Sequence, residues 1–119
     1  MQSLQDFPTD VVSTFVSEES DAPERAAGFL KSIAHRDRLK LLCTLLDGTM
    51  TVTAIEARVG ASQSAVSQHL ARLKAEGLVS SRRDGRQIFY TISDPTVRQL
   101  ITLLYNRFCA TDDKAKGEH

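Results

Sequence analysis

The stretch from Ser62 to Ser93 constrains the fold of this chain more than any other part. After Ser62, a favourable N-cap residue, apolar side chains recur every three or four positions until Gly77. This pattern predicts an amphipathic helix that begins at Ser62 and ends at Gly77. Two short strands then flank Asp84-Gly85, a dipeptide typical of tight hairpin turns.

The two faces of the predicted helix differ in chemistry. The apolar stripe consists of Ala65, Val66, Leu70 and Leu73. The opposite face carries polar side chains that suit hydrogen bonds to base edges and phosphates in a DNA major groove. These residues are Gln63, Ser64, Ser67, Gln68 and Arg72. His69 lies beside the apolar stripe, so it either joins the groove-reading set or packs half-buried.

Arginines gather at the predicted hairpin, at Arg82, Arg83 and Arg86. The whole chain carries 15 basic and 15 acidic residues, so its composition alone does not indicate nucleic acid. The charge is nevertheless unevenly distributed, because residues 1–24 are acidic and residues 62–90 are mainly basic. A local basic surface suits contacts with phosphates or a minor groove. The alternative is that these arginines only keep an exposed hairpin solvated.

A groove-reading helix followed by an arginine-tipped hairpin indicates a winged helix-turn-helix. The segment from Thr51 to Val59 is expected to form the first helix of the motif, and Gly60-Ala61-Ser62 forms the turn. The predicted fold class is therefore mainly α with a β-hairpin wing, in a homodimer. We expect a disordered start over residues 1–8, one DNA-binding and dimerisation domain over 9–111, and a polar tail over 112–119.

Four more helices are expected around this motif. Their ranges are Thr9 to Glu19, Ser20 to Ala34, His35 to Leu46, and Ser93 to Ala110. The inward positions of the first three are Val11, Val12, Phe15 and Val16, then Ala26, Ala27, Leu30 and Ile33, then Leu39, Leu42, Cys43 and Leu46.

The helix from Ser93 to Ala110 has an unusually wide apolar stripe. It consists of Val97, Leu100, Ile101, Leu104, Tyr105 and Phe108. Such a terminal helix commonly closes a dimer, here together with the first helix. The alternative is that it folds back on its own core.

Several classes of protein are disfavoured. No apolar stretch reaches the roughly 18 residues of a membrane span and no signal peptide is visible, so we expect a cytoplasmic protein. The two cysteines are too few for a secreted disulfide scaffold. The sequence holds no Cys-x-x-Cys, no Ser-His-acid arrangement and no glycine-rich phosphate loop, and we therefore expect no enzyme.

From Ala26 to Cys109 the chain resembles the ArsR/SmtB family of small bacterial winged-helix repressors. The resemblance rests on LKSIAHRDR leading into LKLLCTLL, on TVTAIEARVGASQSAVSQHLARLKAEGLV and on GRQIFYTIS, of which SQSAVSQHLARLKAEGLV is the most specific. It implies a homodimer that occupies double-stranded operator DNA and leaves when an inducer binds.

Metal ions are the usual inducers in this family, and here the sequence departs from its metal-sensing patterns. Cys43 stands alone in LLCTLL instead of in a Cys-x-Cys pair, and the last helix has Asp94 but no histidine. His35, His69 and His119 lie in different places along the chain. A zinc site needs about four converging ligands, so metal sensing is disfavoured and we assign no metal ligand and no cofactor.

The pair Cys43 and Cys109 resembles the thiols of the BigR/SqrR/HlyU-like branch, which senses persulfides or oxidants. The resemblance implies that the two cysteine-bearing helices pack side by side and that the reduced dimer binds DNA. A bridge through two or more added sulfur atoms would then lower the affinity, with sulfide-response genes as the expected targets. Responses to general oxidants or to a metal ion remain alternatives. Taken alone, Cys43 is more simply a small core residue.

Overall fold

The computed structural model describes residues 9–109, so the expected disordered start at 1–8 and the expected tail at 112–119 lie outside the described residues. The chain forms two compact units that divide after Ile33. The first unit contains α2 (Thr9–Val16) and α3 (Ala22–Ile33), and these two helices contact each other.

The helices of the first unit form where the sequence predicts them, but their apolar faces are only partly buried. The Ser20 hydroxyl accepts a hydrogen bond from the Ala22 N–H at 3.1 Å, which caps α3 as expected. Ile33 is buried, whereas the expectation that Ala27 and Leu30 face inward is wrong, since both are exposed. The contacting α2 has 8 residues against 12 in α3 and is too short to cover that face.

On α2 itself, Phe15 and Val16 are also exposed. The side chains of the other two expected inward positions, Val11 and Val12, lie outside the described residues.

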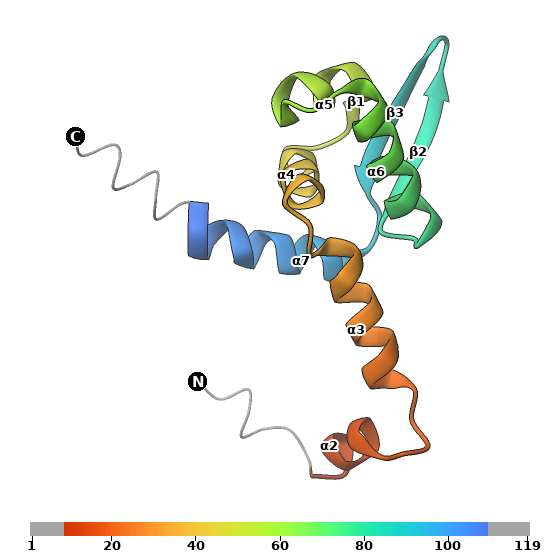
Figure 1. The fold of residues 1–119 in the computed structure, drawn as a ribbon, viewed down its shortest axis with the longest axis vertical. Helices are drawn as coiled ribbons and strands as arrows, with labels where there is room; N and C mark the ends of the chain where they lie inside the picture. Colours follow the sequence, from red (N-terminus) through yellow and green to blue (C-terminus); the bar gives the residue numbers. More distant parts are fainter. Residues whose placement is uncertain (1–8, 110–119) are drawn as a thin grey trace, which may run out of the picture. The chain divides into compact units, whose positions relative to one another are not determined.

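The second unit is a helical core with a three-stranded sheet on one side (Figure 1). Its elements are α4 (Arg36–Leu45), β1 (Met50–Thr51), α5 (Val52–Val59), α6 (Gln63–Ala75), β2 (Val79–Asp84), β3 (Gln87–Ile92), α7 (Pro95–Leu104) and the π-helical turn η1 (Tyr105–Cys109). The hairpin of β2 and β3 extends past α5 and α6 at one end of this unit (Figure 1).

Helix α4 lies at the centre of the second unit and contacts α5, α6, α7 and β3. Leu41, Leu42 and Leu45 are completely buried on it. The sequence predicted that four residues from Leu39 to Leu46 face inward, and only Leu42 is fully buried among them. The other three, Leu39, Cys43 and Leu46, are half-buried, so this prediction is wrong for them. A helix with neighbours on several sides buries a wide part of its surface. The spacing of apolar residues in the sequence does not show which residues lie at the centre of that buried part.

The helix-turn-helix has the predicted boundaries. Ile55 and Val59 of α5 pack inward, and Gly60 ends α5 in the left-handed conformation with φ 76°. The Ser62 hydroxyl accepts a hydrogen bond from the Ala65 N–H at 3.1 Å and begins α6. Val66, Leu70 and Leu73 of α6 are buried, as the apolar stripe predicts, whereas Ala65 is only half-buried.

The wing differs from the expectation in two details. The two-residue turn consists of Gly85 and Arg86, because Asp84 still pairs with Gln87 in the ladder. Gly85 has φ 68° and no other type of residue has a positive φ in the described chain, which fits a turn that needs glycine at its first central position. The short strand β1 also pairs with β3, a third strand that the sequence did not indicate.

The last helix begins at the predicted cap, where an Asp94 carboxylate oxygen accepts a hydrogen bond from the Thr96 N–H at 2.8 Å. Val97 and Ile101 are completely buried. The α-helix ends at Leu104 and continues as the π-helical turn η1 instead of running on to Ala110. The wider stripe is not covered within the described chain, where Tyr105 and Phe108 are exposed.

We predict that Ser62→Ala lowers the free energy of unfolding by about 0.5–2 kcal/mol, because it removes the N-cap acceptor of α6. Urea denaturation measures this change. Ser64→Ala is the matched control, since Ser64 is exposed inside the same helix and does not cap it. Equal losses in the two variants would contradict the capping role of Ser62.

Candidate DNA interface and thiol site

The polar face of α6 is accessible to a macromolecule. Gln63, Ser64, Ser67, Gln68 and Arg72 are all exposed, as the groove-reading prediction requires. The Arg72 Nε donates to the Glu76 carboxylate at 3.3 Å, on the same helix. An exposed pair of this kind contributes little to stability, so phosphate can replace the carboxylate at small cost.

The wing presents its arginines around the hairpin tip. Arg82, Arg83 and Arg86 are exposed. The Arg82 guanidinium lies 4.8 Å from the centre of the Phe89 ring and 3.9 Å from the Asp84 carboxylate. These contacts hold Arg82 near the strand surface, whereas Arg86 occupies the turn itself.

The recognition helix and the wing border one hollow. An open pocket of about 290 Å³ is lined by Gln63 and Ser67 of α6, by Glu56 of α5, and by Arg86 at the wing. Helix α5, helix α6 and the hairpin therefore present one continuous polar surface, as a protein that contacts both bases and backbone requires.

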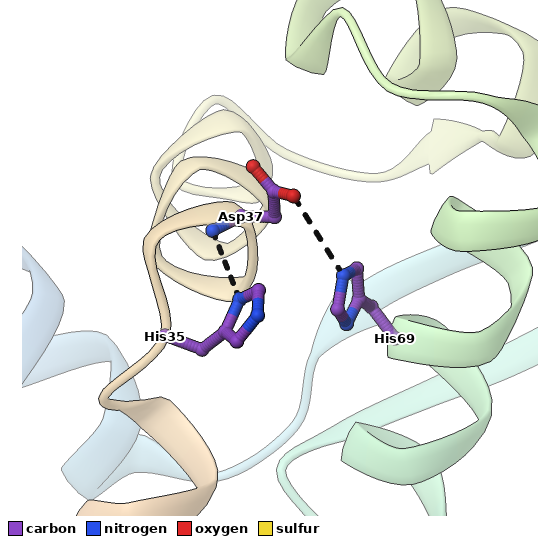
Figure 2. Close-up of side chains that lie close together, drawn as sticks. All are labelled: His35, Asp37 and His69. Atoms are coloured by element: carbon purple, nitrogen blue, oxygen red, sulfur yellow. Dashed lines mark hydrogen bonds and ion pairs between the residues drawn. The ribbon is translucent and has the colours of Figure 1, made fainter.

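His69 lies apart from this surface. Its ring packs against His35 with 4.8 Å between the ring centroids, and its Nε2 lies 4.0 Å from an Asp37 carboxylate oxygen (Figure 2). The side chain is 17% exposed. Burial lowers the pKa of His69, and the neighbouring His35 and Arg38 lower that pKa further. The structure therefore agrees with the half-buried packing alternative and not with major-groove readout.

The two histidines form a cluster that the sequence did not predict. His35 and His69 are distant in sequence and were expected in different places, yet they meet where the start of α4 packs against α6 (Figure 2). No local pattern reveals such a tertiary contact. The available signals were the N-cap position of His35 and the place of His69 beside a buried stripe.

The two cysteines line a common apolar pocket of about 250 Å³. Its other walls are Leu39 of α4, Leu104 of α7, and Tyr105 and Phe108 of η1. Both thiols are free, with Cys43 half-buried and Cys109 exposed. Burial raises the pKa of the Cys43 thiol, and the nearby Cys109 raises that pKa further. Cys109 is therefore the more accessible of the two thiols.

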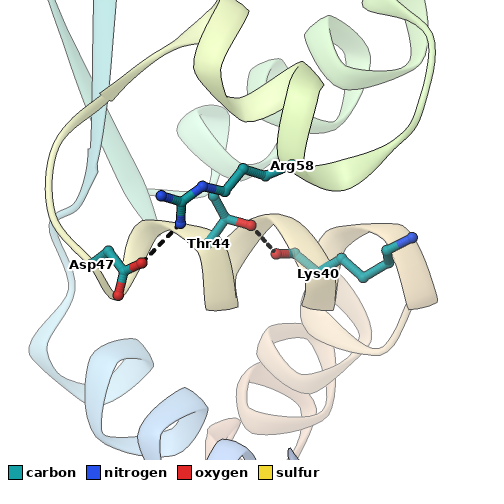
Figure 3. A network of polar contacts seen from close by, with 4 residues as sticks. All are labelled: Lys40, Thr44, Asp47 and Arg58. Atoms are coloured by element: carbon teal, nitrogen blue, oxygen red, sulfur yellow. Dashed lines mark hydrogen bonds and ion pairs between the residues drawn. The ribbon is translucent and has the colours of Figure 1, made fainter.

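Cys43 also borders a second, open pocket of about 410 Å³. Asp47 and Arg58 lie in its wall, where the Arg58 guanidinium donates to the Asp47 carboxylate at 2.8 Å (Figure 3). Thr44 also lines this pocket and donates to the Lys40 carbonyl at 2.8 Å. Sequence reasoning did not single out Asp47 or Arg58, because the pair joins the end of α4 to α5 and shows no local motif.

A helix-turn-helix with an exposed polar second helix and a basic hairpin beside it defines a winged-helix DNA-binding regulator. Residues 35–81 match the family model described as bacterial regulatory protein, arsR family. The chain belongs to this family, whose members are transcriptional regulators that bind operator DNA as dimers. Its relatives include a transcriptional activator and a repressor. No helix among the described residues is long and apolar enough to cross a membrane.

Two curated relatives illustrate the similarity. The chain is 42% identical to the transcriptional activator HlyU of Vibrio cholerae over 85 residues, which cover 71% of this chain and 79% of that protein. It is 39% identical over 89 residues to a biofilm growth-associated repressor of Xylella fastidiosa, covering 75% and 78%. The structure of reduced HlyU from Vibrio cholerae matches with a TM-score of 0.73 at 40% identity, covering 77% of this chain and 97% of that chain.

We predict that Gln68→Ala weakens operator binding by about 1–3 kcal/mol and relaxes specificity at one base position, because Gln68 is exposed on the groove-reading face. Fluorescence anisotropy with a panel of operator variants measures both effects. Gln99→Ala, which removes an exposed glutamine from α7, is the control. Unchanged affinity and specificity in Gln68→Ala would contradict the assignment of α6.

Replacing Arg82, Arg83 and Arg86 together by glutamine is expected to weaken binding to operator and random DNA alike. The reason is that wing arginines neutralise phosphates, so the dependence of affinity on salt also becomes less steep. Binding isotherms at several salt concentrations test this. Arg25→Gln, Lys31→Gln and Lys40→Gln together, which remove three exposed positive charges outside the wing and α6, are the control for net charge. A loss confined to the operator would show base readout instead.

Proposed function

We propose that this protein is a DNA-binding repressor whose operator binding is relieved when persulfides build a sulfur bridge between Cys43 and Cys109. The observation that carries the proposal is the common apolar pocket lined by both thiols. The cysteines come from α4 and η1, which are remote in sequence, so a shared pocket is not a consequence of chain proximity. The names HlyU and biofilm growth-associated repressor among the relatives favour the same branch of the family.

The chemistry begins at the exposed thiol. The Cys109 thiolate attacks the outer sulfur of an organic persulfide. The rest of the reagent leaves as a thiol, and Cys109 becomes a persulfide. Closing the bridge removes two electrons and two protons from the protein. A further persulfide molecule accepts them and is reduced to a thiol and hydrogen sulfide. Each sulfur added to the bridge is therefore sulfane sulfur supplied by the reagent.

The half-buried Cys43 completes the bridge. Its raised pKa keeps it mainly as the thiol at neutral pH, which makes it a poor first nucleophile. It reacts once a sulfur chain on Cys109 has entered the pocket, where proximity compensates for the low thiolate fraction. Apolar walls formed by Leu39 and Leu104 suit sulfane sulfur better than a hydrated oxidant.

Helix α4 connects the bridge to DNA. It bears Cys43 on one side and packs against both helices of the helix-turn-helix. A bridge ties α4 to the end of the last helix and restricts how the recognition helices adjust to successive grooves. A coupling of about 1–3 kcal/mol between the two events is sufficient for regulation.

A two-fold dimer supplies the second recognition helix. The first and last helices carry the exposed apolar side chains Phe15, Val16, Leu103 and Phe108, which suit a subunit interface. The dimer then covers an inverted repeat whose half-sites lie about one helical turn apart, or a small multiple of it. Sulfide-response genes are the proposed targets.

A general oxidant is the second candidate inducer, since any reagent that joins the thiols would constrain the same helices. Peroxide would produce a direct disulfide, which requires Cα atoms about 4.4–6.8 Å apart. Release of the operator by persulfide but not by peroxide separates the two inducers, and equal release by both would favour the general oxidant.

We predict that an organic persulfide such as glutathione persulfide adds sulfur between Cys43 and Cys109 and releases the operator. Mass spectrometry and DNA binding are measured on the same samples. Cys43→Ser and Cys109→Ser remain bound after treatment, because neither can close a bridge. If either single variant still releases DNA, the mechanism with two cysteines fails.

A further inference from the structure

Three side chains with metal-ligating groups converge where the start of α4 packs against α6. His35 and Asp37 lie at the start of α4, and His69 lies in the middle of α6 (Figure 2). One ligand atom from each of the three lies within 4.8 Å of the others. We propose that His35, Asp37 and His69 form a binding site for a divalent transition-metal ion of the zinc class.

The donor set indicates this class of ion. Two imidazole nitrogens and one carboxylate oxygen suit zinc, cobalt and nickel, whereas magnesium and calcium prefer all-oxygen sites. The Asp37 and His69 side chains are 34% and 17% exposed, and His35 is exposed. Water therefore has access to the remaining coordination positions of a site with three protein ligands.

The distances require only a small contraction. The His69 Nε2 and the Asp37 Oδ2 are 4.0 Å apart, which is too long for a direct hydrogen bond. Metal–ligand bonds of about 2.0–2.2 Å in a tetrahedral arrangement place two ligand atoms roughly 3.3 Å apart. Closure therefore moves these two atoms together by less than about 1 Å, and a pair at the 4.8 Å limit of the cluster by about 1.5 Å, which is within the reach of side-chain rotation.

Metal binding at His35 would cost a hydrogen bond. The His35 Nδ1 accepts a hydrogen bond from the Asp37 N–H at 3.1 Å, so in the neutral ring the proton lies on Nε2. A metal ion bound at Nδ1 would replace this hydrogen bond, and one bound at Nε2 would require the proton to leave Nε2. Metal binding and capping of α4 therefore compete at the same imidazole.

An occupied site would join the start of α4 to the recognition helix. A ligand that binds only the folded state raises its stability by mass action. We expect saturating zinc to raise the midpoint of thermal unfolding by at least about 4 °C. This inference does not depend on the persulfide proposal, because neither cysteine belongs to the cluster.

The test uses the full chain with both cysteines replaced by serine, so that thiolates cannot bind the metal. Zinc is titrated in competition with a chromophoric chelator, and cobalt is added separately for its absorption spectrum. We expect one zinc ion per chain and weak cobalt d–d bands. His69→Gln and Asp37→Asn each lower the zinc affinity at least about tenfold, and each abolishes the thermal shift.

Two variants make the result specific. His35→Asn removes the imidazole but keeps an acceptor at the N-cap, so it loses zinc affinity while its metal-free unfolding midpoint is unchanged. His119→Ala removes the remaining histidine of the chain and leaves zinc binding intact. Retention of zinc affinity in both His35→Asn and His69→Gln overturns the proposal. Loss of zinc binding in His119→Ala also overturns it.

Discussion

Burial of α4 is the constraint on which the rest of the second unit depends. Leu41, Leu42 and Leu45 have no exposed surface, and the helix that carries them contacts α5, α6, α7 and β3. Truncating one such leucine to alanine typically costs about 2–5 kcal/mol, a large part of the stability of a small domain. The helix-turn-helix, the wing and the last helix are therefore positioned by a common support, and a change at α4 reaches all three.

Two sides of α4 differ in their chemical environment. Cys43 faces the apolar pocket shared with Cys109, and Arg38 on another side of α4 is buried near Arg72 and Glu76 of the recognition helix. Burial lowers the pKa of Arg38, and Arg72 lowers that pKa further while Glu76 raises it. Charged residues at the recognition helix therefore shift the pKa of a residue that is buried on α4. In the proposed mechanism, α4 is the direct connection between a modified Cys43 and both helices of the helix-turn-helix.

Features set by local chemistry were predictable from the sequence. The caps at Ser62 and Asp94 and the helix end at Gly60 follow from residue type and position. Features set by tertiary packing were not. Neither the pairing of β1 with β3 nor the meeting of His35 with His69 has a local signal, because each joins segments far apart in sequence. The exposed polar side chains of α6 could be listed in advance. The half-buried position of His69 could not be predicted, because a residue at the edge of an apolar stripe packs according to its tertiary neighbour, which here is His35.

Under the proposed mechanism, joining Cys43 to Cys109 is by itself sufficient to release the operator. The most direct measurement replaces the sulfur chain with a synthetic bridge, a bis-methanethiosulfonate reagent whose linker is a single methylene group. Methyl methanethiosulfonate, which caps each thiol without joining them, is the control. Operator affinity is measured by anisotropy on protein whose modification is verified by mass spectrometry. We expect the bridged protein to lose at least about fivefold in affinity and the capped protein to change little. A bridged protein that retains its full affinity, or a capped protein that loses as much, would contradict the proposed mechanism.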